Sequence, residues 1–157
     1  MSVLSFHLAC DPPTATAQQR KHRIVGKGAN QFVSTYKPAN VRAAERLLET
    51  LLLPHRLEKP IQGPISAQID WVFPWRASET KKIRSEFARY PKDTQPDADN
   101  SNKLLLDIME RLGFYSNDAQ IYDLRPRKWW GDKPGISVVL RSGDSLPTLP
   151  RKEGVLL

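Results

Sequence analysis

A strict alternation of apolar residues is the feature that most limits what this chain can fold into. It runs from Ile65 to Phe73 through Ala67, Ile69 and Trp71, and Pro74 closes it. Successive side chains of a β-strand point to opposite faces, so this period of two predicts a strand with one buried face. It is the clearest strand signal in the chain, and the rest of the fold has to be built around it.

Two segments have helical spacing instead. The first begins after Pro38 and ends before Pro54, and the second runs from Asn100 to Leu112 with Gly113 as a fitting residue beyond its end. Four further strands are expected at 3–9, 31–36, 120–128 and 136–141, and a short helix is expected to open near Ser78. This order predicts an α+β fold, a single small domain with a mixed β-sheet flanked by helices.

The length of 157 residues corresponds to about one domain. We expect the domain to span 1–142, with a basic loop at 14–30 and a basic segment at 76–92, and 143–157 to be a loose tail. The only cysteine, Cys10, rules out an internal disulfide and fits a reducing cytoplasm. Apolar runs fall far short of the roughly 20 residues that span a bilayer, and no signal peptide is evident, so no membrane association is expected.

The net charge of +7 is unevenly distributed. Residues 1–92 contribute +8 and residues 124–157 contribute +4, whereas residues 93–123 contribute −5. A basic protein of this kind is expected to bind a polyanion. Bare carboxylates would repel that ligand, but a bound divalent cation would reverse the repulsion.

The acidic island contains a segment suited to such a cation. Pro96 favours an extended backbone before it, and if the extension continues to Asp99, the side chains of Asp97 and Asp99 point to the same side. Their carboxylates could then share one hard cation such as Mg²⁺. In the helix that follows, Asn100, Lys103, Asp107 and Arg111 form one polar stripe, and Lys103 lies one turn from the carboxylates. Asp118 could join them only through tertiary folding.

Simpler interpretations exist for each of these residues. Asp99 or Asn100 is a good N-cap residue, Lys103 could be a solvated lysine, and Asp118 could be an ordinary turn residue. A calcium-binding EF-hand loop is excluded, because Asn102 and Ile108 stand where that loop requires Gly and Glu.

The stretch from Pro96 to Ile121 resembles a family. RusA-type Holliday-junction resolvases, common in phages and prophages, carry a K-P-D-x-D-N-x-x-K segment, then a helix, an aspartate, a glycine and D-D-x-Q-I/V. Without gaps, this chain has Gln95-Pro96-Asp97-Ala98-Asp99-Asn100-Ser101-Asn102-Lys103, then Asp107, Gly113 and Asn117-Asp118-Ala119-Gln120-Ile121. A looser resemblance covers most of the chain, although the loop at 14–30 matches poorly.

The resemblance implies a RusA-like fold and a function. It identifies Asp97, Asp99 and Asp118 with the three metal-binding catalytic aspartates and Lys103 with the catalytic lysine, and it gives Asn100 and Asp107 supporting roles. Asn117 stands where the family commonly has Asp and is not counted as a ligand. The family is homodimeric and Mg²⁺-dependent, with Mn²⁺ expected to substitute, and it makes paired symmetric nicks in four-way DNA junctions.

Basic residues outside the motif are expected to bind DNA backbone phosphates, namely Arg20, Lys21, Arg23, Lys81, Lys82 and Arg84. Trp71 and one of Trp129 and Trp130 are expected in the core. Two rival functions stay open. One is a non-catalytic DNA-binding protein with a structural acidic face, and the other is a metal-dependent nuclease acting on flap or single-stranded DNA.

Overall fold

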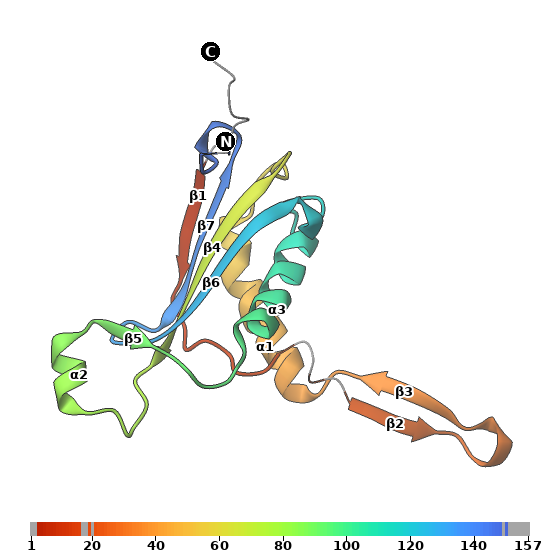
Figure 1. Ribbon diagram of the computed structural model, residues 1–157. Helices are drawn as coiled ribbons and strands as arrows, with labels where there is room; N and C mark the ends of the chain where they lie inside the picture. Colours follow the sequence, from red (N-terminus) through yellow and green to blue (C-terminus); the bar gives the residue numbers. More distant parts are fainter. Residues whose placement is uncertain (1–2, 17–18, 20, 149, 151–157) are drawn as a thin grey trace.

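The computed structural model describes residues 3–16, 19, 21–148 and 150. Five strands form one sheet in the order β1-β7-β4-β6-β5, and β2 and β3 form a separate two-stranded ribbon that projects from the body (Figure 1). The strands are β1 (Val3–Leu8), β2 (Lys21–Val25), β3 (Phe32–Tyr36), β4 (Ile65–Pro74), β5 (Arg89–Pro91), β6 (Ile121–Gly131) and β7 (Gly135–Ser142), and the helices are α1 (Ala39–Leu52), α2 (Lys81–Glu86) and α3 (Ala98–Arg111). The predicted α+β fold with a mixed sheet is confirmed.

The core lies between one face of the sheet and the two long helices. The alternating residues of β4 from Ile65 to Phe73 point into it, where they meet Leu48 of α1 and Leu105 and Met109 of α3. Figure 1 shows α1 and α3 side by side on this face. The predicted alternation of the central strand is therefore correct. The residues between, such as Ser66 and Asp70, are also buried, on the opposite face, where they make side-chain hydrogen bonds.

A buried polar contact joins the central strand to α3. The Trp71 indole Nε1–H donates to Asn102 Oδ1 at 3.1 Å, and both side chains are almost inaccessible to solvent. Asn102 Nδ2–H in turn donates to the carbonyl of Ala98, in the first turn of the helix. Trp71 and Asn102 thus fix where the beginning of α3 sits on the sheet. Trp130 packs against the same core, so the expectation for the tryptophans is also confirmed.

The sheet topology makes α3 part of a crossover. β4 and β6 are parallel neighbours, and every other neighbouring pair is antiparallel. Parallel neighbours need a long connection from one end of the sheet back to the other. Here that connection runs from Pro74 to Ile121 and carries α2, β5 and α3. The acidic segment before α3 therefore lies at the end of the sheet where β4 finishes.

The expected basic loop at 14–30 is only partly a loop. Lys21–Val25 forms β2, which pairs antiparallel with β3. The β-branched residues Ile24 and Val25 favour a strand, but the polar and glycine residues around them hide this preference in the sequence. Gly26 makes the turn possible, because its φ is +99° and a Cβ there would lie 2.2 Å from the Asn30 carbonyl oxygen.

Two other expectations change in detail. The short helix α2 begins at Lys81, and its N-cap is Thr80, whose side chain accepts from the Ile83 N–H at 3.3 Å, instead of Ser78. The segment expected to be a loose tail starts with a 3-10 turn, η4 (Gly143–Ser145), and residues 149 and 151–157 lie outside the described part of the chain. None of the described helices has the length and apolar character needed to cross a membrane.

Removing the buried amide should destabilise the fold. Asn102→Ala leaves the Trp71 indole N–H and the Ala98 carbonyl without their partner, so we expect the free energy of unfolding to fall by roughly 1–3 kcal/mol. Ser101→Ala is the matched control, because Ser101 is also buried but its Oγ has no hydrogen-bond partner among the described residues. Urea unfolding followed by fluorescence would measure both, and equal stability of the two variants would contradict the role given to Asn102.

Candidate active site

Helix α3 begins two residues earlier in the acidic segment than the sequence predicted, at Ala98 instead of Asn100. Asp97 is the N-cap, with extended backbone angles (φ −67°, ψ 143°), and the helix already includes Ala98. The Ser101 N–H donates to the Asp97 carbonyl at 3.2 Å, which closes the first turn. The extended backbone, on which a shared side for Asp97 and Asp99 was conditional, therefore does not continue to Asp99. The simpler interpretation of Asp99 or Asn100 as the N-cap is wrong.

The carboxylates at this end of the helix are available for other contacts. The Asp97 side chain caps no helix N–H, although it occupies the capping position. Asp97 and Asn100 line a polar pocket of about 410 Å³ together with Thr14 and Thr16 from the loop after β1. Asp99, in the first helical turn, is exposed to solvent. Their place at the helix N-terminus, where the backbone dipole favours negative charge, suits two acidic side chains so close together.

Two lysines hold the segment that leads into this site. Lys128 on β6 donates its Nζ–H groups to the carbonyls of Thr94 at 2.7 Å and Pro96 at 2.9 Å. Lys92 lies with its Nζ 3.8 Å from the centre of the Trp130 ring, and burial, together with the nearby Lys128 charge, lowers its pKa. The sequence placed Lys92 in a basic segment and gave Lys128 no role, because no local pattern distinguishes a structural lysine from a solvated one.

Lys103 lies one turn further along α3 and is exposed. It makes no hydrogen bond or ion pair with any residue that the structure describes. A cationic side chain of this kind, beside two carboxylates and open to solvent, is free to contact an anionic ligand. The first half of α3 thus brings together Asp97, Asp99, Asn100 and Lys103.

Asp118 is held beside the other half of the helix. It opens the 3-10 turn η3 (Asp118–Gln120), and its backbone N–H donates to Glu110 Oε2 at 3.0 Å. Asn117 caps this turn by accepting from the Ala119 N–H at 2.8 Å. Gln120 ties the turn to the body by donating to the carbonyls of Ile61 and Gly63. The sequence gave Gln120 only as part of the motif, and the structure shows its anchoring role.

Acidic side chains gather around Asp118. Burial raises the pKa of the Tyr115 hydroxyl, and the negative charges of Glu110, Asp118 and Asp107 raise it further. Tyr115 itself donates to the Leu106 carbonyl at 2.8 Å. The sequence missed Glu110, whose position in the second half of an amphipathic helix looks like ordinary solvent exposure.

The predicted metal ligands therefore lie at opposite ends of α3. Eleven helical steps separate Asp99 from Glu110, a rise of roughly 16 Å at 1.5 Å per residue. Ligand oxygens of a bound Mg²⁺ lie only about 2.1 Å from the ion. Within the described part of the chain, no three His, Cys, Asp or Glu side chains are grouped to hold a metal ion. A three-aspartate metal site does not fit the geometry of one chain.

Comparison with known proteins identifies the family. The model of the endodeoxyribonuclease RusA family matches residues 12–141, which is most of the chain and includes α3 and η3. The protein belongs to the RusA family of endodeoxyribonucleases. It is also 28% identical over 145 residues to the uncharacterized protein YqaN of Bacillus subtilis (strain 168), a match that covers 90% of this chain and 97% of the relative.

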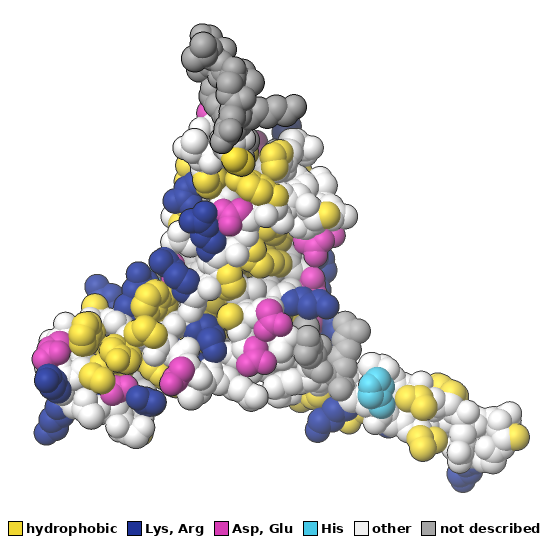
Figure 2. Space-filling model, viewed as in Figure 1, with side chains coloured by type: hydrophobic (Ala, Val, Ile, Leu, Met, Phe, Trp, Pro, Cys, Tyr) yellow, Lys and Arg dark blue, Asp and Glu magenta, His cyan; other side chains and the backbone are white. Residues whose placement is uncertain are grey.

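The basic residues expected to bind DNA lie on two projections of this RusA-family chain. Lys81, Lys82 and Arg84 are on α2, which with β5 forms one lobe, whereas Lys21 and Arg23 are on the β2–β3 ribbon. In the view of Figure 1 the start of α3 lies between the two. Figure 2 shows Lys and Arg side chains gathered on the α2 lobe, while the visible face of the ribbon is largely uncharged. Arg20 lies outside the described residues.

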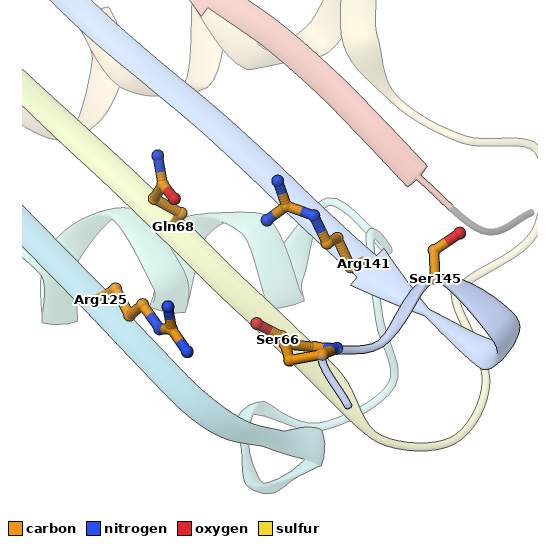
Figure 3. Close-up of a pocket in the computed structure, with 6 residues that line it drawn as sticks. Ser66, Gln68, Arg125, Arg141 and Ser145 are labelled. Atoms are coloured by element: carbon orange, nitrogen blue, oxygen red, sulfur yellow. The ribbon is translucent and has the colours of Figure 1, made fainter. Parts of the chain in front are cut away.

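The sheet face that carries no helix offers a second basic site. Arg125 of β6 and Arg141 of β7 flank Ser66 and Gln68 of β4 around a pocket of about 240 Å³ (Figure 3). Arg125 is paired with Asp123 at 3.2 Å. Sequence reasoning did not single out these arginines, because they come from strands far apart in the chain.

Next to this pocket, Asp70 organises a hydrogen-bond network. Its carboxylate accepts from Arg127 Nε at 2.6 Å, Arg127 Nη2 at 2.7 Å and Trp129 Nε1 at 2.9 Å. Burial disfavours the charged form of Asp70, but the hydrogen bonds from Arg127 and Trp129 outweigh it and lower the pKa. On this sheet face, the charges of Asp70 and Arg127 are therefore explained by their contribution to the stability of the fold.

Asp70→Asn should change the response of stability to acid. Because the pKa of Asp70 is lower in the folded chain than the ordinary value near 3.9, its contribution is complete above that value and is lost as pH falls. We expect the variant to lose roughly 1.5–3 kcal/mol at pH 7 and less near pH 3, measured by urea unfolding. Asp144→Asn, at an exposed position after β7, is the control. An equal loss at both pH values would contradict this assignment.

Proposed function

We propose that the protein is a structure-selective endonuclease that resolves four-way (Holliday) DNA junctions. In this proposal a homodimer makes paired symmetric nicks by Mg²⁺-dependent hydrolysis of phosphodiester bonds, and Mn²⁺ substitutes for Mg²⁺. Membership of the RusA endodeoxyribonuclease family supports the nuclease activity. The choice of substrate and the symmetry of cleavage rest on the match between the family motif and the stretch from Pro96 to Ile121.

The observation that carries the proposal is the chemistry at the start of α3. Asp97 and Asp99 present carboxylate oxygens, the ligands that Mg²⁺ takes in phosphoryl-transfer sites, and Lys103 presents a cation one turn away. The Lys103 ammonium is suited to offset the charge that develops on the scissile phosphate. Asn100, beside Asp97 in the pocket wall, is a supporting polar residue.

Phosphate contacts away from this centre would hold the DNA without reading its sequence. Lys81 and Lys82 on the α2 lobe and Lys21 and Arg23 on the ribbon are exposed, and the proposal assigns them to the DNA backbone. Basic residues on two separate projections, the α2 lobe and the ribbon, suit a branched substrate better than a single straight duplex. Because DNA is the substrate, the proposed place of action is the cytoplasm.

Loss of one carboxylate should abolish cleavage without abolishing binding. We expect Asp99→Asn to lower the rate of junction nicking by roughly 10²–10³-fold, as when one charge-stabilising group is removed. Its exposed position means that the fold should be retained. The measurement compares a four-way junction, a flap and a linear duplex of the same sequence, with and without Mg²⁺, and Asp144→Asn is the matched control.

Each outcome of this assay separates the candidate functions. Paired nicks that require Mg²⁺ and occur in the junction support the resolvase. Faster cleavage of the flap would identify a flap nuclease instead. Tight binding of the junction without nicks, in Mg²⁺ or in Mn²⁺, would identify a DNA-binding protein that does not cut.

The α2 lysines should affect affinity through charge alone. For the double variant Lys81→Ala with Lys82→Ala, we expect weaker junction binding and a slope of log K against log salt that is smaller by about 1–2, since each lost phosphate contact changes it by about 0.9. Lys59→Ala removes an exposed lysine from the connection between α1 and β4 and serves as the control. Fluorescence anisotropy at several salt concentrations gives both quantities, and an unchanged slope would exclude α2 from the interface.

A further inference from the structure

The β2–β3 ribbon exposes apolar side chains that the fold of one chain leaves uncovered. Ile24 and Val33 lie opposite each other across the two strands and are 70% and 67% exposed, and Phe32 is 60% exposed. Figure 2 shows hydrophobic side chains along the visible face of this projection. Within the described part of the chain, β2 and β3 pair only with each other, and a two-stranded ribbon standing alone in water is marginally stable. Clustered apolar residues on such an element mark a binding surface.

The charge of this segment indicates what kind of partner covers it. From Pro12 to Ala44 the sequence contains six Lys and Arg residues and no Asp or Glu. Arg23 lies on the same face of the ribbon as Phe32, and its guanidinium carbon is 5.5 Å from the centre of the Tyr36 ring. A surface that is cationic and aromatic complements nucleic acid, because phosphates attract the cations and bases stack on the rings. A second copy of this basic chain is a poorer match.

We propose that the apolar end of the ribbon inserts at the crossover of a four-way junction, where Phe32 stacks on a base that the branch leaves exposed. This inference rests on the proposed function, because it takes a DNA junction as the ligand. Insertion of an apolar side chain into a continuous duplex costs stacking free energy. At a crossover the stacks of neighbouring arms are already interrupted, so the cost is smaller. The end of the ribbon therefore favours branched DNA over linear DNA.

The two ends of the ribbon have different contributions to binding. Lys21 is at the end joined to the body, whereas Phe32 is next to the turn at the far end. Lys37, which follows β3, pairs with Glu45 of α1 at 2.6 Å and ties the joined end to the body. Cations near the body contact phosphates of any DNA, and the aromatic ring at the far end contacts bases. Affinity and selectivity for branched DNA thus depend on different residues.

Two variants separate these contributions. We expect Phe32→Ala to lower the affinity for a four-way junction about tenfold, as when one base loses its stacking partner, and to change the affinity for a linear duplex by less than about twofold. Lys21→Ala should weaken both complexes by a similar factor and reduce their dependence on salt, because only a lost charge alters counterion release. Fluorescence anisotropy without divalent cations measures both affinities and prevents metal-dependent cleavage.

Two further variants serve as controls for folding and for exposed apolar surface. Phe32→Trp keeps an aromatic ring and should retain the preference for the junction, which separates loss of stacking from collapse of the ribbon. Leu53→Ala removes a 49% exposed apolar side chain just after α1 and should leave both affinities unchanged.

Photochemical crosslinking locates the end of the ribbon on the DNA. Junctions carry one iodouracil either at the crossover or in the middle of an arm, and the crosslinked peptides are identified by mass spectrometry. The tryptic peptide 28–42, which contains Phe32, should crosslink at the crossover and not in the arm.

The outcomes distinguish this inference from the proposed function. Equal losses of junction and duplex affinity in Phe32→Ala, or no crosslink at the crossover, would overturn the inference. A smaller assembly of Phe32→Ala in sedimentation would also overturn it, because the ribbon would then dock on a second copy of the chain. If the wild type prefers the junction but nicks no DNA in Mg²⁺ or Mn²⁺, the nuclease proposal fails and the same binding measurements still decide the role of Phe32. If the wild type nicks junctions and Phe32→Ala keeps the full preference, only the inference fails.

Discussion

The hydrogen bond between Trp71 and Asn102 fixes the position of the candidate active site relative to the sheet. It is made between two side chains that water does not reach, so each group would be left unpaired if the other moved. Through the second bond of Asn102, to Ala98, the constraint passes directly into the helical turn that carries Asp99. The central strand thereby dictates where two exposed carboxylates stand, although neither of them contacts that strand.

Sequence periodicity was sufficient to predict a strand or helix where burial follows a simple geometric repeat. The alternation from Ile65 to Phe73 and the helical spacing before Leu112 both describe one buried face, and the structure retains them. It was insufficient where tertiary contacts decide. β2 depends on its pairing with β3, and β5 (Arg89–Pro91) depends on β6, the one strand that pairs with it within the described ranges of the chain. The early start of α3 depends on a side chain, Asn102, that bonds back to the first turn.

The candidate site shows the same division. Local sequence identified Asp97, Asp99 and Lys103 because they follow one another within two helical turns. It could not place Asp118, whose location depends on how Glu110 and Gln120 hold a turn against the body. Nor could it show that Lys128 secures the segment before the helix, because that contact joins residues more than 30 positions apart. A linear motif records which groups are present, and the fold decides which of them meet.

The parallel pairing of β4 with β6 has a consequence for how the molecule comes to be active during folding. The helix that bears the carboxylates lies inside the crossover between these two strands, so pairing of the strands fixes both ends of the segment that carries the site. Contacts between residues far apart in sequence form slowly, because closing the loop costs chain entropy before the contacts contribute any favourable free energy. A partly folded molecule has the same carboxylate and lysine side chains but does not hold them in the geometry of the site. Nuclease activity therefore depends on completion of the native sheet.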